Sequence, residues 1–194
     1  MIEVYTQSFD GVWFGVACAQ GQIVASSFGP SQKVTTANIL VCLPFNIPFQ
    51  VFNEPTSFAK KAINSIKNIY YGKDADIDFS LAFVSLPTYT QKVLKATMKI
   101  PVGYVTSYSQ IAQAAGGGPR AVGNVMAKNP YAPIVPCHRV VKSDFTLGGY
   151  GMGLKTKWEI LTKEKRGFLH SKEIMLDGCQ FEVFPVEYVL KNLV

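Results

Sequence analysis

The sequence predicts an α+β fold made of a small sheet-plus-helix domain followed by a mostly helical domain. Three observations support this prediction. Residues 1–30 are rich in β-prone residues, residues 58–71 have helical periodicity, and residues 106–127 suggest two short helices around a glycine-rich turn. With 194 residues, 48% of them hydrophobic, the chain can build two small cores. We expect domains at 1–86 and 87–170, followed by an extension at 171–194.

Composition excludes several classes of protein. No apolar run approaches the roughly 18 residues of a membrane-spanning helix, and no signal-peptide pattern opens the chain. The four cysteines are scattered without a CxxC pair and there are only two histidines, so neither a metal nor another cofactor is expected. A reduced, intracellular setting is expected: the cytoplasm near the nucleoid in a prokaryote, or the nucleus in a eukaryote. The sequence alone does not decide whether Cys18 and Cys42 form a disulfide.

Positive charge is concentrated in the second half of the chain. Residues 1–86 hold five Lys and no Arg against six Asp and Glu, a net charge of −1. Residues 87–194 hold fourteen Lys and Arg against seven acids, a net charge of +7. This asymmetry suggests that the second half binds a polyanion, although ordinary solubilising surface charge would give the same count.

The first domain contains a predicted hairpin and a predicted helix. Residues 12–19 and 23–28 are β-prone runs joined by a Gly-centred turn at 20–22, which is typical of an antiparallel hairpin. Residues 31–53 are ambiguous, because prolines near residue 48 oppose a central strand. Residues 58–71 have isoleucines at helical spacing with lysines opposite them. No residue pattern here carries chemistry, so we interpret this domain as a scaffold.

The second domain begins near Leu86-Pro87 with a helix expected over 88–99 and a short extended segment at 105–106. Thr106 or Ser107 can then cap a helix that runs to Ala115. Three glycines form a turn, and Pro119 suits the first position of another helix, over 120–127. The pattern fits a DNA-binding helix-turn-helix, but an ordinary αα-corner in a packed core fits it as well.

Three more elements follow in the sequence. A helix is expected over 154–165, with an apolar side formed by Trp158, Ile160 and Leu161 and a basic side formed by Lys155, Lys157, Lys163 and Lys165. Residues 173–176 and 179–184 predict a hairpin with a type I′ turn at Asp177-Gly178. A short helix is expected over 186–193. The hairpin and the short helix of residues 171–194 suggest no function.

The stretch that carries chemistry is Pro136-Cys137-His138-Arg139-Val140. An apolar pair, Ile134-Val135, precedes it, so we expect the cysteine at the end of a buried strand. A thiol needs a base or a positive charge nearby to become a nucleophile, and His138 and Arg139 are candidates for these roles. Taken alone, the pattern also fits a buried structural cysteine.

Four motifs together resemble the O6-alkylguanine-DNA alkyltransferases, also called methylated-DNA–protein-cysteine methyltransferases. These motifs are Arg120–Gly123, Asn129-Pro130, Pro136–Val140 and Gly148–Tyr150. The resemblance covers about residues 87–167, roughly two-fifths of the chain. It implies an RNase H-like first domain, a winged helix-turn-helix-like DNA-binding unit in the second, and single-use transfer of an alkyl group, chiefly methyl, from guanine O6 to Cys137.

The resemblance also implies catalytic roles for five residues. Cys137 is the nucleophile, and His138 takes its proton through a bridging water. Glu164, 27 residues after Cys137, matches the carboxylate that orients the histidine. Asn129 matches a hinge residue that ties the DNA-binding helix to the cysteine segment, although a helix C-cap role fits it too. Tyr108 matches a tyrosine that donates to guanine N3.

The remaining implied residues contact DNA or line the base pocket. The resemblance places Arg120 in the stack in place of a flipped nucleotide. The DNA-binding set is Arg120, Ala121, Gly123, Tyr108 and Ser107, and the pocket set is Tyr150, Gly151, Val140, Met152 and Lys157. The expected partner is duplex DNA containing O6-alkylguanine, bound by a monomer, and no membrane is involved. The relatives carry glycine at the position of Met152 in some cases, so a narrower pocket is expected here.

Two alternatives fit parts of the pattern. One is a protein that flips alkylated bases without transferring the alkyl group. The other is a cysteine hydrolase with a Cys137–His138–Glu164 triad. The presence of Cys137 opposes the first alternative, and the adjacency of Cys and His opposes the second.

Overall fold

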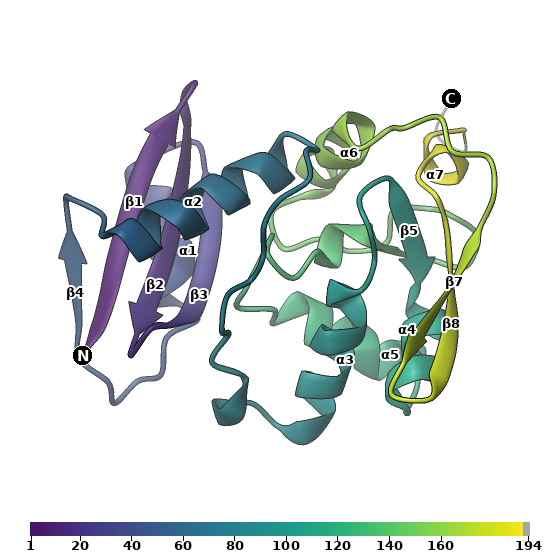
Figure 1. Cartoon of the computed structure of the whole chain (residues 1–194), viewed down its shortest axis with the longest axis horizontal. Coiled ribbons are helices and arrows are strands. Elements are labelled where there is room, and N and C mark those ends of the chain that lie inside the picture. The colour runs from purple at the N-terminus through teal and green to yellow at the C-terminus, as the bar shows by residue number, and fades with distance from the viewer. Residues whose placement is uncertain (192–194) are drawn as a thin grey trace. The chain divides into compact units, whose positions relative to one another are not determined.

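The computed structural model describes residues 1–191 and divides the chain into two compact units (Figure 1). Unit 1 consists of Met1–Tyr70, Ala75–Ser85 and Pro130–Ile134, and unit 2 consists of Tyr71–Asp74, Leu86–Asn129 and the residues from Val135 onward. Two four-stranded sheets and seven α-helices occur within the described residues, which confirms the mixed α+β class. The chain passes between the units more than once, and the predicted domain boundaries stay a prediction.

The sheet of unit 1 is built from two consecutive hairpins and one later strand. Its strands are β1 (Ile2–Phe9), β2 (Val12–Ala19), β3 (Gln22–Gly29) and β4 (Phe49–Phe52), in the order β3-β2-β1-β4. The hairpins are antiparallel, whereas β4 pairs with β1 in parallel. Both central residues of the Gln20-Gly21 turn have positive φ, as a type I′ turn requires. The hairpin predicted from the sequence is therefore confirmed.

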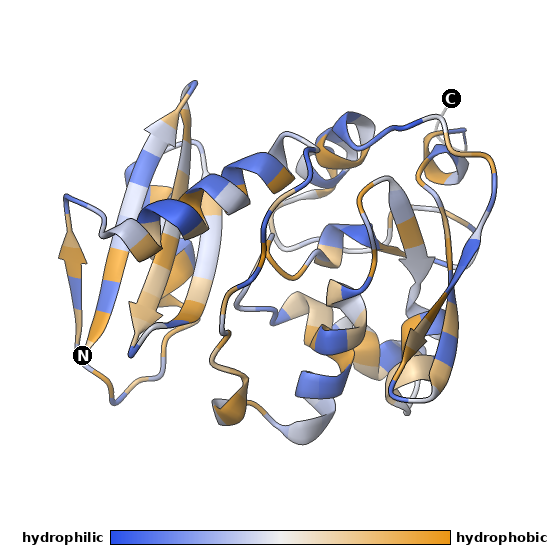
Figure 2. Cartoon of the chain, viewed as in Figure 1, coloured by the Kyte–Doolittle hydropathy of each residue, from blue (hydrophilic) through white to orange (hydrophobic). Residues whose placement is uncertain are grey.

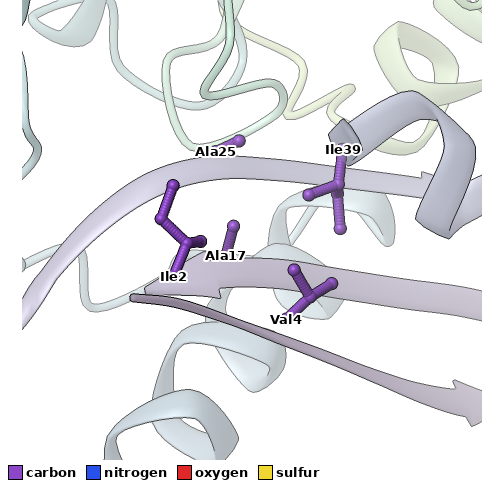
Figure 3. Close-up of a cluster of buried hydrophobic side chains, with 5 residues drawn as sticks. All are labelled: Ile2, Val4, Ala17, Ala25 and Ile39. Atoms are coloured by element: carbon purple, nitrogen blue, oxygen red, sulfur yellow. The ribbon is translucent and has the colours of Figure 1, made fainter. Parts of the chain in front are cut away.

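Helices cover both faces of this sheet. Helix α1 (Gln32–Leu40) begins after Ser31, whose side chain accepts from the Val34 N–H. Its Ile39 packs with residues of β1, β2 and β3 in the buried cluster of Figure 3, formed by Ile2, Val4, Ala17, Ala25 and Ile39. On the opposite face of β2, the ring of Phe14 meets Tyr70 of α2 (Ser57–Tyr70) edge to face. Helix α2 matches the predicted helix closely. In Figure 2, hydrophilic and hydrophobic residues alternate along its ribbon.

Unit 2 contains three helices that pack against one another. They are α3 (Thr88–Met98), α4 (Tyr108–Ala115) and α5 (Pro119–Ala127). A strand, β5 (Tyr104–Ser107), leads directly into α4, and the Ser107 side chain caps that helix by accepting from the Gln110 N–H at 3.2 Å. Gly118 precedes α5, whose first residue is Pro119. All three predicted helices are confirmed.

Strands from the C-terminal part of the chain complete the second sheet. Its order is β6-β5-β8-β7, with β6 (Val140–Val141), β7 (Lys172–Leu176) and β8 (Cys179–Pro185). The predicted hairpin is confirmed, and Asp177 and Gly178 both have positive φ. Two helices complete the unit, α6 (Leu154–Lys163) and α7 (Glu187–Lys191). The helix predicted to reach Leu193 extends beyond the described residues, since 192–194 lie outside them.

A buried apolar cluster joins these elements. It consists of Val105 from β5, Val141 from β6, Leu161 from α6, and Val186 and Val189 from the C-terminal extension. Cys18 and Cys42 are both free, so the disulfide left open by the sequence does not form. Among residues 1–191, no helix is both long and apolar enough to cross a membrane.

Candidate active site

Cys137 begins a short 3-10 turn, Cys137–Arg139, and does not end a strand as the sequence suggested. The apolar pair Ile134-Val135 that prompted this expectation lies between Pro133 and Pro136, and proline cannot donate to a strand ladder. The strand β6 comes after the turn. Cys137 is 6% exposed and His138 is fully buried, so the turn places both side chains inside unit 2.

A buried ionic cluster lies beside the cysteine. The Nε2 of His138 is 3.0 Å from Oε1 of Glu164, and neither side chain is exposed. Arg139 donates to the same carboxylate through Nε, at 3.0 and 3.1 Å, and through Nη2 at 2.8 Å. The remaining guanidinium nitrogen, Nη1, donates to the Ile100 carbonyl at 2.7 Å. Glu164 therefore holds both side chains that follow the cysteine.

Electrostatics fix the protonation states in this cluster. Burial would raise the pKa of Glu164, but Arg139 and His138 outweigh it and hold this pKa at about 2. Burial lowers the pKa of His138, and the opposing effect of Glu164 does not reverse this. An ionised Glu164 can only accept, so the neutral imidazole donates its Nε2–H to the carboxylate. Its Nδ1 then carries a lone pair, and this buried atom has no partner among the described residues.

The resting thiol is protonated. Burial raises the pKa of Cys137, while a hydrogen bond from Asn129 and the charge of Lys157 oppose this rise. A standing thiolate is therefore absent at neutral pH, and a base must take the proton when the cysteine reacts. His138, neutral and with a free lone pair, has the required chemistry.

Lys157 is fully buried, although the sequence placed it on the basic side of its helix. Its Nζ donates to three carbonyls, those of Val140 at 2.6 Å, Leu147 at 2.5 Å and Gly149 at 3.2 Å. Burial lowers the pKa of Lys157 to about 8, and Cys137 opposes this fall. The lysine thus fastens the loop at 147–149 to the residue that follows the cysteine turn.

Asn129 connects the end of α5 to the segment before the cysteine. Its Nδ2 donates to the Val135 carbonyl at 2.9 Å. The C-cap of α5 is Lys128, so the alternative role of Asn129 as that cap is wrong. The five residues between Asn129 and Val135 belong to unit 1, and the side-chain bond closes this excursion of the chain.

Tyr108, assigned to catalysis and DNA contact, and Tyr150, assigned to the base pocket, both lie along the glycine-rich loop. The Tyr108 hydroxyl accepts from the Gly149 N–H, and the same ring lies so close to Gly148 that a Cβ there would be 2.9 Å from it. Gly148 also has a positive φ of 66°, which favours glycine. The Tyr150 ring stands edge-on to His138 at 6.4 Å, and its hydroxyl lies 3.9 Å from the Met152 sulfur. Gly151, beside them, is exposed.

The residues assigned to DNA contact are divided between surface and interior. Arg120 is exposed, and Ala121 and Gly123 are partly exposed on α5. A Cβ added to Gly123 would meet no atom within 4 Å, so the helix backbone is open there. Ser107 is buried at 6% exposure and its hydroxyl caps α4. Its assignment to DNA stays a prediction, as do the other assigned roles.

Sequence reasoning missed the role of Arg139 and of the Ile100 carbonyl. Arg139 was a candidate for activating the thiol, but its donors are directed to Glu164 and Ile100. No local pattern marks Ile100, because its carbonyl is a backbone group. A signal for Lys157 did exist: residues 157, 160, 161 and 164 share one face of α6, and the other three are buried.

Together, the buried cysteine, the neutral histidine and the ionised carboxylate provide a thiol, a base and an acid that orients the base, a combination that can support nucleophilic chemistry. The family model of the DNA-binding domain of 6-O-methylguanine DNA methyltransferases matches residues 88–166. A methylated-DNA–protein-cysteine methyltransferase of Metallosphaera sedula is 34% identical over 140 residues, 72% of this chain and 88% of the relative. That of Methanothermobacter thermautotrophicus is 37% identical over 113 residues, 58% of this chain and 64% of the relative.

Solved structures agree with these sequence matches. The O6-methylguanine-DNA methyltransferase of Pyrococcus kodakaraensis is 28% identical, with a TM-score of 0.67 over 84% of this chain and 99% of that chain. The OGT of Mycobacterium tuberculosis in complex with DNA is 26% identical, with a TM-score of 0.67 over 84% and 92%. The chain belongs to the methylated-DNA–protein-cysteine methyltransferase family. It spans 64% and 49% of the lengths of the Methanothermobacter and Pyrobaculum aerophilum relatives.

Proposed function

We propose that this protein repairs O6-alkylguanine, chiefly O6-methylguanine, in duplex DNA by transferring the alkyl group to Cys137. The observation that carries the proposal is the unpartnered, buried Nδ1 of a neutral His138, whose other nitrogen is held by an ionised Glu164. This is the arrangement of an activated nucleophile, with a base oriented by a third group. Membership of the family supplies the substrate class.

In the proposed reaction the thiol proton moves to His138 Nδ1, directly or through a water. The sulfur of Cys137 forms a bond to the alkyl carbon, and the bond from that carbon to guanine O6 breaks. The electron pair of the broken bond passes to the guanine ring. The ring takes up one proton, which balances the proton lost by the thiol, and stays in the DNA as unmodified guanine. Glu164 stabilises the imidazolium that forms, as the acid does in a nucleophile–histidine–acid triad.

The substrate carbon lies inside a base stack, so the base must leave the duplex before sulfur can reach it in line. We assign α4 and α5 to a winged helix-turn-helix-like DNA-binding unit, with an RNase H-like arrangement in the first domain. The small residues of α5 suit close approach to a shallow minor groove better than they suit base reading, because no Asn, Gln or Arg array is available. Arg120 would fill the gap left by the flipped nucleotide.

The base pocket is formed by the cysteine turn and the glycine-rich loop. Tyr108, whose hydroxyl accepts from Gly149, would donate its own proton to guanine N3. Tyr150 would pack beside the base, and the Gly151 N–H would serve guanine O6. The carbonyls of Cys137 and Val140 would accept from the guanine amine. The Val140 carbonyl already accepts from Lys157, which leaves one lone pair for the substrate.

The transfer consumes the protein. The product is a thioether at Cys137. Among residues 1–191 no group is placed to hydrolyse so inert a bond, so each monomer accepts one alkyl group. Met152, beside the Tyr150 hydroxyl, would restrict the pocket and disfavour adducts as large as benzyl.

Labelled methyl transfer tests this proposal. Duplex DNA carrying O6-[¹⁴C-methyl]guanine is incubated with the wild-type protein and with Cys137→Ala. We expect one label per wild-type molecule on Cys137, located by peptide mass spectrometry, and none on the variant, which should still bind the duplex. Binding without label would overturn the proposed transfer and favour the alternative of a non-transferring base-flipping protein. The absence of both binding and label would overturn the proposal as a whole.

A further inference from the structure

Given the proposed function, we propose that Glu187 is a positioning residue for the transfer reaction, which holds Glu164 in place through the backbone of residues 166–167. Glu187 lies in α7, within the C-terminal extension to which the sequence assigned no function. The family model ends at residue 166, so this part of the chain lies outside the family match. The extension nevertheless contacts the backbone of residues 166–167, close in sequence to Glu164.

The contact is a carboxylate that accepts from two consecutive backbone N–H groups. Oε1 of Glu187 accepts from the Gly167 N–H at 2.6 Å and from the Arg166 N–H at 3.2 Å. The side chain is buried, with an exposure of 9% for the residue. Hydrogen bonds to a charged acceptor in such surroundings are among the stronger ones in proteins.

These N–H groups belong to the turn that directly follows Glu164. Glu164 is the C-cap of α6, so the position of its carboxylate depends on the end of that helix as well as on its bonds to His138 and Arg139. Arg166 folds back on this end, and its guanidinium donates to the carbonyls of Lys163 and Lys165 at 3.3 Å each and also bonds to the Gly72 carbonyl. Holding the Arg166 backbone therefore keeps its side chain on the carbonyl of Lys163, the last residue of α6, and on that of Lys165 just beyond it.

The same part of the extension also braces the segment that holds Arg139. The Val186 N–H, next to Glu187, donates to the Gly103 carbonyl at 2.9 Å. Gly103 follows closely after Ile100, whose carbonyl binds Arg139. Gly103 has a φ of 81°, and a Cβ there would be 2.8 Å from the Phe168 ring. The extension thus contacts the supports of both Glu164 and Arg139, the two charged partners of the ionic cluster.

Apolar packing anchors the backbone of the segment that carries Glu187. Val186 and Val189, on either side of it, are fully buried against Val105, Val141 and Leu161. Leu161 is three residues before Glu164 on α6, and Val141 directly follows Val140 of the cysteine segment. A side chain anchored in this cluster loses little further freedom when it bonds to residues 166–167.

Three variants of the full chain test the proposal. Glu187→Ala removes the acceptor, whereas Glu187→Gln keeps an oxygen in the position of Oε1 and replaces Oε2, an atom with no protein partner among the described residues. Glu173→Ala removes an exposed carboxylate from the same extension as a matched control. For each variant we would measure the rate of labelled methyl transfer from O6-methylguanine duplex, the affinity for undamaged duplex, the melting temperature, and the NMR signal of the His138 N–H that is bonded to Glu164.

We expect Glu187→Ala to transfer roughly tenfold more slowly at a temperature where it is fully folded, because a small displacement of a catalytic group is enough for such a loss. Its DNA affinity should be unchanged, and its His138 N–H signal should shift or broaden. Glu187→Gln, which keeps the acceptor but loses its charge, should slow transfer less than Glu187→Ala does, and Glu173→Ala should match the wild type. If Glu187→Ala does not fold, Glu187→Asp replaces it in the test. Its side chain is shorter by one methylene, so we expect the same slower transfer and the same change in the His138 signal.

A folded Glu187→Ala or Glu187→Asp protein with the wild-type transfer rate and an unchanged His138 signal would overturn the positioning role. A lower melting temperature with an unchanged rate would likewise reduce Glu187 to a purely structural residue and overturn it. Failure of the proposed function looks different, since the wild-type protein itself would then take up no label.

Discussion

Replacing Glu164 by Gln should destabilise the folded protein by about 3 kcal/mol at neutral pH. The carboxylate is fully buried, and its pKa is about 2 against an ordinary value of 4.5. A gap of this size between the folded and unfolded states corresponds to about 3 kcal/mol of stabilisation. The general cost of removing one partner from a buried ion pair, about 3–5 kcal/mol, agrees with it. Arg139 would keep its buried charge with no carboxylate to neutralise it.

The pH dependence of this difference has a defined sign. The folded-state pKa of Glu164 lies below the unfolded value, so the stabilisation is complete above about pH 5 and is lost as the pH falls from about 4.5 toward 2. By about pH 3, roughly 2 kcal/mol of it should be gone. The wild type and Glu164→Gln should therefore approach each other in stability as the solution is acidified.

Thermal and urea unfolding of the two proteins at several pH values measures this. For a chain of this size, about 3 kcal/mol corresponds to a melting temperature lower by roughly 6–12 °C. Glu159→Gln, on the same helix but partly exposed, is the control and should melt near the wild-type temperature. A Glu164→Gln protein that melts within about 2 °C of the wild type at neutral pH would refute the reasoning, as would a difference that does not change on acidification.

Three further predictions concern the transfer reaction. Arg120→Ala should slow transfer from damaged duplex roughly tenfold, about 1.4 kcal/mol, and affect reaction with free O6-alkylated base less; equal losses on both substrates would count against its place in the base stack. Lys157→Met should slow transfer about tenfold by releasing the glycine-rich loop. Lys155→Met, on the exposed side of α6, should transfer at the wild-type rate. Equal transfer rates for the two variants in a single-turnover assay would contradict this. Methylation of Cys137 should lower the melting temperature, because a dense interior tolerates even one added carbon poorly; calorimetry showing no change would refute it.

Local patterns predicted the elements whose partners are close in sequence. Helix α2 was expected at 58–71 and lies at Ser57–Tyr70, because its apolar and basic residues separate cleanly onto two faces. The hairpin at Asp177-Gly178 was predicted from its turn residues alone. A type I′ turn requires positive φ at both central positions, and the Asp-Gly pair is one that adopts it readily. In each case the physical cause is contained within a few consecutive residues.

Elements that depend on distant partners were not predicted. Helix α1 buries only Thr35 and Ile39, so its sequence shows almost no apolar face. Strand β4 has four residues, and its pairing partner is β1, more than forty residues earlier in the chain. A pattern within 31–53 could not reveal either of them, because the sheet that stabilises them forms from residues outside that range.

The candidate site was predictable in its residue types but not in its connections. The resemblance identified Cys137, His138 and Glu164, and the structure brings the histidine and the carboxylate into contact. It gave no indication that Arg139 neutralises Glu164, or that a fully buried Lys157 holds three carbonyls. Lys and Arg are ordinarily exposed. Their buried charges are tolerated here because each guanidinium nitrogen of Arg139 and the ammonium of Lys157 bond to acceptors.

Under the proposed function, the protonation states explain how so buried a thiol would react. Burial raises the pKa of Cys137 and lowers that of His138, so both groups are neutral at rest. The charge of Glu164 is already balanced by Arg139. Moving the thiol proton to His138 creates one negative and one positive charge side by side and adds no net charge to the interior. Burial penalises each isolated charge far more than such a pair, so the thiolate is available mainly when His138 holds its proton and an alkyl carbon is in place to take the sulfur's electrons.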